Sequence, residues 1–103
     1  MQIILTTTAE LHEAESLASK LVEARLAACV QIVQPVTSVY VWEGEVRKET
    51  EYLLLIKTVP EKWEMVRDMI TANHSYEVPE IVVIDAEKVS EPYLAWMRET
   101  ILL

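Results

Sequence analysis

Hydrophobic positions along the chain switch between two periods, and this switching predicts the first strand and helix. Residues 2–7 are mostly apolar or β-branched and predict a short buried strand. Over residues 10–25 the apolar positions instead recur at helical spacing, with acidic residues mostly on the opposite face. Thr7 stands three residues before Glu10, which is the spacing of a capping box at the start of a helix.

A long hairpin is predicted next. Residues 27–42 read as one strand that is interrupted at Pro35, because proline cannot donate a hydrogen bond to a neighbouring strand. Glu43 and Gly44 predict a tight turn, since glycine tolerates positive φ. Residues 45–58 predict the returning strand. Its first half is charged and its second half is apolar, so we expect this strand to leave the core partway along.

The remaining pattern predicts two helices and one more strand. Thr58 and Glu61 again have capping-box spacing, and the helix that follows is expected to end near Ala72. Residues 81–84 are apolar on both faces, which predicts a central strand that is covered on both sides. Residues 91–101 predict a last amphipathic helix.

The order β-α-β-β-α-β is that of the ferredoxin-like fold, in which two helices cover one face of an antiparallel sheet. We therefore expect an α+β fold of ferredoxin-like βαββαβ type, with a long hairpin between its second and third strands and an extra C-terminal helix. Residues 1–103 form one domain in this interpretation. Hydrophobic residues make up 51% of the chain, more than one small core needs, so a partner subunit is expected to cover the other sheet face.

The net charge and the single cysteine limit the partners and the cellular compartment that we expect for the protein. The net charge of -8 disfavours nucleic acid and anionic membrane surfaces as partners. Neither a signal peptide nor an apolar run long enough to span a membrane is apparent. A single cysteine suits a reducing compartment, so we expect a cytoplasmic protein that neither binds nucleic acid nor inserts into membranes.

Candidate metal ligands lie mainly in residues 74–80. His74 can bind a metal when it is neutral, but a closed site needs about four ligands. Glu77, Glu80 or groups from a neighbouring subunit would have to complete it. The alternative is a histidine that hydrogen-bonds the backbone. Cys29 could supply a thiolate to a soft metal, or could pack in the core as a small apolar residue.

A small-molecule cleft is the second hypothesis for the same region. Tyr76, Pro79 and Glu80 form a possible contact set, and Lys57, at the end of an apolar run, is a candidate anion-binding residue. Structural alternatives stay open, because Pro79 could simply fix the start of the strand and Lys57 could pair with a nearby glutamate.

Aromatic residues suggest where a neighbouring subunit would bind. Tyr40 and Trp42 share one face beside the hairpin turn, away from the expected core, which predicts burial in an oligomer interface. Trp63 and Trp96 lie on helical faces and are expected to pack inside the domain. His12 is surrounded by glutamates and is expected to be solvated.

Several segments together resemble the CutA family, also called the divalent-cation tolerance proteins. These segments are residues 21–23, 26–30, 38–44, residue 51 with 54–58, and residues 74–81 and 93–96. The resemblance implies a ferredoxin-like homotrimer, similar in architecture to PII signalling proteins and often thermostable. It also implies a link to copper and other divalent cations, with no cofactor needed for folding and no established enzymatic activity.

The chain differs from copper-binding members at the positions that resemble their ligands. Those members have a cysteine at the end of the first strand and a pair of histidines before the later proline-containing segment. Thr6, Asn73 and His74 stand at the matching positions here. Only His74 is of a ligand type, so we expect weak or absent stoichiometric copper binding.

Three functions follow from these observations. The first is a non-enzymatic trimer that binds copper, other divalent metal ions or a small ligand at clefts between subunits. The second is a PII-like small-ligand sensor or a scaffold for protein interaction. The third, a small hydrolase of acylphosphatase type, is disfavoured because the turn at residues 6–9 has neither the glycine nor the arginine of an anion cradle. We therefore expect no enzymatic activity.

Overall fold

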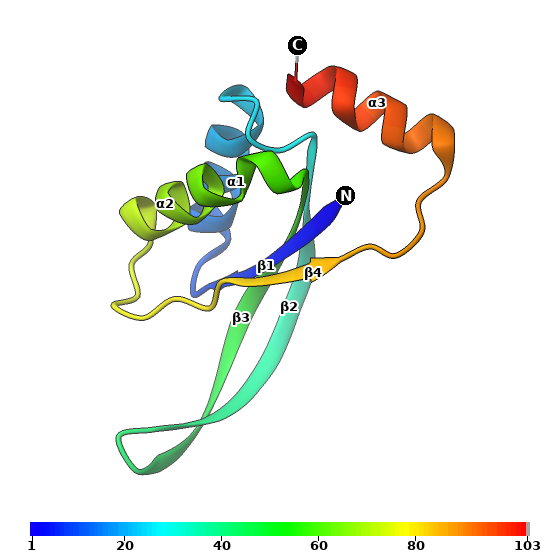
Figure 1. The fold of residues 1–103 in the computed structure, drawn as a ribbon. Coiled ribbons are helices and arrows are strands. Elements are labelled where there is room, and N and C mark those ends of the chain that lie inside the picture. The colour runs from blue at the N-terminus through cyan, green and yellow to red at the C-terminus, as the bar shows by residue number, and fades with distance from the viewer. Residues whose placement is uncertain (103) are drawn as a thin grey trace.

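The computed structural model shows a four-stranded antiparallel sheet with two helices on one face and a third helix at one end (Figure 1). It describes residues 1–102, so Leu103, the last residue of the expected domain, lies outside the described residues. The elements are β1 (Gln2–Thr8), α1 (Leu11–Glu23), β2 (Cys29–Trp42), β3 (Glu45–Thr58), the 3-10 turn η1 (Pro60–Lys62), α2 (Trp63–Asn73), β4 (Val82–Asp85) and α3 (Glu91–Leu102).

The strand order is β2-β3-β1-β4, which confirms the predicted α+β fold of ferredoxin-like type. None of the helices in the described residues is long and apolar enough to cross a membrane.

A single apolar cluster holds α1 and α2 against the sheet. Alternate residues of β1 and β3 point toward the helices, and α1 buries the positions that recur every three or four residues. The cluster is built from side chains that are almost fully buried: Ile4, Ala14, Leu17, Leu21, Leu54, Ile56, Val66 and Ile70. Burial of each larger aliphatic side chain stabilises the fold by roughly 1.5–3 kcal/mol, so this cluster fixes where the helices lie.

Neither predicted capping box forms. Glu10 is the residue before α1 and no side chain caps it; instead, the hydroxyl of Thr8 donates to the Glu10 carbonyl at 3.0 Å. The hydroxyl of Thr58 donates to the Leu26 carbonyl at 2.6 Å and so ties the end of β3 to the α1–β2 connection. These two predictions were wrong because each threonine belongs to a strand: Thr7 pairs with Leu53 inside β1, and Thr58 uses its hydroxyl on the Leu26 carbonyl.

The long hairpin forms as predicted. Pairing between β2 and β3 runs to Trp42 and Glu45, and the turn places Glu43 at φ 51° and Gly44 at φ 79°. Both values lie in the left-handed region, which suits a two-residue hairpin turn that contains glycine. The register shifts between Val33 and Val36, on either side of the proline that the sequence marked. The predicted interruption is therefore a β-bulge.

The hairpin gives the molecule its elongated shape. Figure 1 shows β2 and β3 running well past the ends of β1 and β4. The chain measures 45 × 26 × 23 Å, and its radius of gyration is 14.3 Å. A compact domain of this length would have a radius of gyration of about 13 Å. The stem of the hairpin is therefore left without helices over either face.

The sheet face opposite the helices is apolar, and no helix or strand among residues 1–102 covers it. The register places one set of alternate residues on it: Ile3, Leu5, Leu53, Leu55, Val82 and Ile84. Val82 and Ile84 are 46% and 48% exposed. The predicted central position of this strand was wrong, because β4 pairs with β1 alone and lies at the sheet edge. One face of β4 packs on the core through Val83, and the other belongs to the open face.

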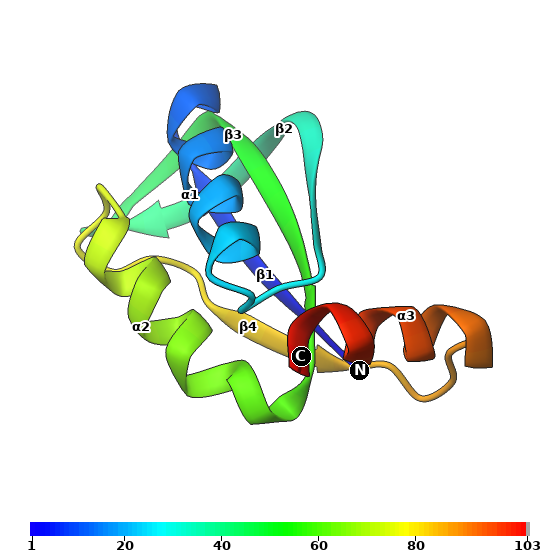
Figure 2. The same ribbon diagram turned by 90° about the horizontal axis from the view of Figure 1, so that it is seen from above.

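α3 packs at the end of the sheet near the N-terminus (Figure 2). Met97 and Ile101 are buried against Ala28 and Val59 in a second small cluster. Trp96 was predicted to pack within the domain, but it is 45% exposed and lies beside the Tyr93 ring, 5.5 Å between ring centres. A helix that covers only the end of the sheet can bury one narrow face.

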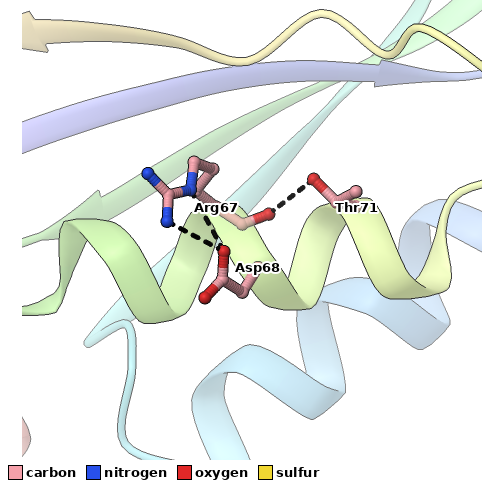
Figure 3. A network of polar contacts seen from close by, with 3 residues as sticks. All are labelled: Arg67, Asp68 and Thr71. Carbon is pink, nitrogen blue, oxygen red and sulfur yellow. Dashed lines mark hydrogen bonds and ion pairs between the residues drawn. The ribbon is translucent and has the colours of Figure 1, made fainter.

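Polar groups on the outer surface of α2 contact one another (Figure 3). The Arg67 guanidinium contacts the Asp68 carboxylate at 3.0 and 3.1 Å, and the Thr71 hydroxyl donates to the Arg67 carbonyl at 2.9 Å. Such exposed contacts between near neighbours add little to stability. This surface therefore reads as an ordinary solvated helix face rather than as a site.

Candidate functional site

His74 uses both of its ring nitrogens within its own chain. Nε2 lies 2.6 Å from the carbonyl oxygen of Thr7, and Nδ1 lies 3.0 Å from the backbone nitrogen of Tyr76. A carbonyl only accepts and a backbone N–H only donates, so the ring is neutral with its proton on Nε2. A metal ion could bind either nitrogen only if one of these bonds broke.

Tyr76 reaches across the end of β1 to β3. Its hydroxyl donates to Oε2 of Glu51 at 2.7 Å. The carboxylate belongs to a residue that is only 7% exposed. Burial and the adjacent Glu51 carboxylate raise the pKa of Tyr76, so the phenol stays protonated and keeps donating.

The other side of the segment is fastened to α1. The Glu13 carboxylate accepts the backbone N–H of Ser75 at 2.9 Å and its hydroxyl at 3.2 Å. One residue earlier, the Asn73 side-chain oxygen accepts from the Lys20 ammonium at 2.9 Å. The start of the segment is therefore held by α1 and β1, and Tyr76 adds an anchor to β3.

A pocket of about 660 Å³ lies between this segment and the stem of the hairpin, on the side of the open sheet face. It is lined by Thr7, Ser38, Val39, Tyr40, Trp42, Arg47, Glu49, Glu51, Tyr76, Glu77, Val78 and Glu80. That size is in the range of small-molecule sites. The lining has four carboxylates and one guanidinium, so its charge favours a cation.

Several of the residues singled out from the sequence meet in this pocket. Tyr76, Glu77 and Glu80 form one wall, and Tyr40 and Trp42 lie on the hairpin opposite. Tyr40 is 37% and Trp42 is 42% exposed, as expected of side chains that a partner could cover. Desolvation and the nearby Glu49 carboxylate raise the pKa of Tyr40.

Other predicted site residues lie elsewhere. Cys29 pairs with Lys57 across β2 and β3, at the end of the sheet far from the hairpin turn. The Lys57 ammonium lies 5.6 Å from the centre of the Tyr93 ring. Pro79 adjoins the pocket in sequence but does not line it.

The predicted metal ligands are not gathered into one cluster within a chain. Residues 1–102 contain no group of three or more histidine, cysteine, aspartate or glutamate side chains placed to hold a metal ion. His74, Cys29 and Glu77 therefore do not form a self-contained site in this chain.

Seven lining residues of the pocket were not site candidates in the sequence, and two of them, Glu51 and Arg47, have buried polar atoms. Glu51 and Arg47 belong to a strand half that reads only as charged. Their signal was the alternation of the strand, which places both on the face that carries the Tyr76 contact. Arg47 is notable because its Nε is buried and has no hydrogen-bond partner.

Comparison with known proteins agrees with this architecture. The profile described as "CutA1 divalent ion tolerance protein" matches residues 2–100. The chain belongs to the CutA family of divalent-cation tolerance proteins. This confirms the resemblance inferred from the sequence.

Among CutA relatives, that of Thermus thermophilus is 42% identical over 98 residues, which cover 95% of each chain. Its solved structure matches with a TM-score of 0.93 over 97% of this chain and 98% of that chain. The CutA structure from Archaeoglobus fulgidus, described as periplasmic, is 41% identical, with a TM-score of 0.94 over 98% and 99% of the two chains. The chloroplastic protein of Arabidopsis thaliana is 37% identical over 98 residues, which make up 95% of this chain and 54% of the relative.

Proposed function

We propose that this CutA protein contributes to divalent-cation tolerance as a homotrimer that binds a cationic ligand in the pocket beside its hairpin. The single observation that carries the proposal is the continuity between the uncovered apolar sheet face and the carboxylate-lined pocket. The names of its relatives, divalent-cation tolerance proteins, supply the biological context.

The open face supports assembly. Soluble monomers rarely expose a contiguous apolar face of this kind. The accessible surface of the chain is 6412 Å². A monomer of this mass typically exposes about 5,900 Å². Joining copies through the open face would bury its aliphatic side chains together with Tyr40 and Trp42, and would place a neighbouring subunit at the rim of the pocket.

Charge supports a cation as the ligand. The chain carries a net charge of -8, and carboxylates outnumber cations four to one in the pocket. Copper prefers imidazole and thiolate ligands. His74 already uses both ring nitrogens and Cys29 lies at the far end of the sheet, so we propose that the pocket binds hard or organic cations in preference to copper. We further propose binding rather than catalysis, in the cytoplasm.

Light scattering tests the assembly. We expect a trimeric mass at micromolar concentration, and we expect Leu55→Glu, which puts a charge in the middle of the open face, to give a smaller species. Met65→Glu is the matched control, since Met65 is 48% exposed on the outer side of α2. A monomeric wild type, or a Leu55→Glu variant with unchanged mass, would refute this interface.

A further inference from the structure

One strip of the open sheet face carries opposite charges at its two ends. Glu51 and Lys57 both lie on this face of β3, because residues an even number of positions apart on a strand share a face. Two leucines, Leu53 and Leu55, lie between them, and these four residues form the β3 strip. The residues paired with the β3 strip on β1 and β2 are all uncharged, so its two ends carry the only charges in these rows of the sheet.

Neither charge has an oppositely charged partner within the described residues. Glu51 is 7% exposed and accepts the Tyr76 hydroxyl, but no ion pair among residues 1–102 involves its carboxylate. Lys57 is half-buried, and its ammonium lies over the Tyr93 ring without an ion pair among the same residues. The two charges cannot meet within one chain, because the six residues of strand from Glu51 to Lys57 span about 20 Å.

A neighbouring subunit on the open face would remove both charges from water. Desolvation of an isolated carboxylate or ammonium is costly, and buried charges in proteins are normally paired. A second copy of the chain presents the same β3 strip, with one charge of each sign. The cation that Glu51 lacks is therefore available from the Lys57 end of that copy.

Aromatic side chains accompany both ends of the β3 strip. Tyr93 lies beside Lys57, and Trp96, which is 45% exposed, lies next to Tyr93. At the other end, Tyr40 and Trp42 line the pocket beside the hairpin. Aromatic residues are enriched in protein interfaces. The two ends are therefore complementary in charge, and both offer aromatic surface to a partner.

We propose that the Lys57 ammonium of one subunit pairs with the Glu51 carboxylate of the next, so that each pocket is completed by its neighbour. This inference rests on the proposed function, which joins copies through the open face. It brings Lys57 to the pocket, although within one chain this residue lies at the opposite end of the sheet. The carboxylates of Glu49, Glu77 and Glu80 keep the completed pocket acidic.

Three-fold symmetry adds a geometric condition. Each contact in a closed ring joins two different patches, here the Glu51 end of one β3 strip and the Lys57 end of the next. Equivalent atoms of a ring lie at one height along its axis. The two ends therefore meet only if β3 runs around the three-fold axis rather than along it.

A double-mutant cycle on assembly tests the pairing. Sedimentation equilibrium compares the wild type with Glu51→Gln, Lys57→Gln and the double variant. We expect each single change to weaken assembly by about tenfold or more, because it leaves one buried charge without its partner. The double variant should assemble no more weakly than either single variant, because it removes both charges. Glutamine at position 51 can still accept the Tyr76 hydroxyl, so the contact within the chain is kept.

Exposed residues on the two helices provide matched controls. Glu15→Gln on α1 and Arg67→Gln on α2 each remove one charge on the helix side of the sheet, and neither should change assembly. If a control weakens assembly as much as the variant of the same sign, the effect comes from net charge and the pairing is overturned.

Charge exchange identifies the partner. Glu51→Lys and Lys57→Glu should each lower the assembled mass in light scattering, because like charges then meet at the interface. The combined variant should recover the trimeric mass. Arg47 is the other cation beside the pocket. Recovery when Glu51→Lys is combined with Arg47→Glu instead would assign the pairing to Arg47 and overturn the proposal.

The outcomes separate this inference from the proposed function. A monomeric wild type would refute both. A trimeric wild type with additive single effects, and without recovery on charge exchange, would overturn the pairing and leave the trimer intact. If the Glu51 variants do not fold, a crystal structure of the assembled wild type decides. The Lys57 nitrogen should then lie within about 4 Å of the partner subunit's Glu51 carboxylate, and a larger separation would overturn the proposal.

Discussion

The Nδ1 atom of His74 accepts a hydrogen bond from the backbone N–H of Tyr76 at 3.0 Å, while Nε2 of the same ring contacts the Thr7 carbonyl oxygen at 2.6 Å. The imidazole therefore bridges the end of β1 and the segment that leads to β4. The Tyr76 ring lies 4.8 Å from the imidazole between centres, and its hydroxyl continues to Glu51. His74 thus positions a wall of the pocket, and this use occupies the atoms that a metal would need.

His74→Ala should reduce stability without reducing copper binding. The substitution leaves the Thr7 carbonyl and the Tyr76 N–H without their partner, and we expect the free energy of unfolding to fall by about 1–3 kcal/mol. Urea unfolding measures this change, and calorimetry with Cu²⁺ measures the affinity. His12→Ala, at an exposed position on α1, should stay within about 0.5 kcal/mol of wild type. Tight copper binding that disappears in His74→Ala would contradict this role.

Tyr76 should make the stability of the protein sensitive to alkaline pH. Burial and Glu51 raise the pKa of its phenol in the folded state, so the folded state favours the protonated form. The stabilisation is complete below the unfolded pKa of about 10 and is lost as pH rises from there toward the folded pKa. Tyr76→Phe should lower the free energy of unfolding by about 1–2 kcal/mol at pH 8, because Glu51 loses its donor.

Unfolding of wild type and Tyr76→Phe at pH 8 and pH 11 provides the measurement. The difference between the two proteins should shrink at pH 11. Tyr52→Phe, which removes a phenol hydroxyl from a tyrosine that packs against the core, is the matched control. A Tyr76→Phe difference that does not vary with pH would show that the phenol does not titrate as described.

Thr6→Val should stabilise the protein by about 1 kcal/mol. Thr6 is fully buried under the helices, and its hydroxyl has no hydrogen-bond partner. Valine has nearly the same shape and removes the unpaired group. Thr8→Val is a matched control on the same strand face, because the Thr8 hydroxyl donates to the Glu10 carbonyl and its loss should destabilise. Urea midpoints that move in the same direction for both variants would contradict this account.

Turn residues and short hydrophobic patterns in the sequence predicted much of the fold. The bounds of β3 came out at residues 45–58, as expected, because Gly44 marks the turn and apolar residues mark the far half of the strand. The edge position of β4 could not be predicted in this way. An edge strand with one face on the core and one on the open face has the same apolar pattern as a central strand.

The sequence predicted only some residues of the candidate site, because its contacts join segments that are far apart in the chain. Tyr76 and Glu80 stood out as a cluster because they are close in sequence. The partner of Tyr76 is Glu51, 25 residues away, and it is brought within reach by the pairing of β1 with β3. A charged strand gives no indication of which carboxylate will be buried, since that depends on which segment crosses it.

α1 is followed by a residue other than glycine, Arg25, in the left-handed backbone conformation. Arg25 has φ 58°, and its N–H donates to the Val22 carbonyl at 3.1 Å, while the next N–H, that of Leu26, donates to the Leu21 carbonyl at 3.0 Å. This is the hydrogen-bonding pattern of a helix that ends with a left-handed residue, where glycine is preferred. A residue with a Cβ is destabilised there by roughly 1 kcal/mol. Arg25 is exposed and makes no ion pair among the described residues, so little is lost with its side chain.

Arg25→Gly should therefore raise the free energy of unfolding by about 0.5–1 kcal/mol. Ala24→Gly is the control one residue earlier, where φ is -80°, and it should destabilise by up to about 1 kcal/mol, since glycine there only loses conformational freedom on folding. Urea unfolding of the two variants should move the midpoint in opposite directions. If both substitutions lower the urea midpoint, the Arg25 side chain stabilises the fold by more than its left-handed backbone conformation destabilises it.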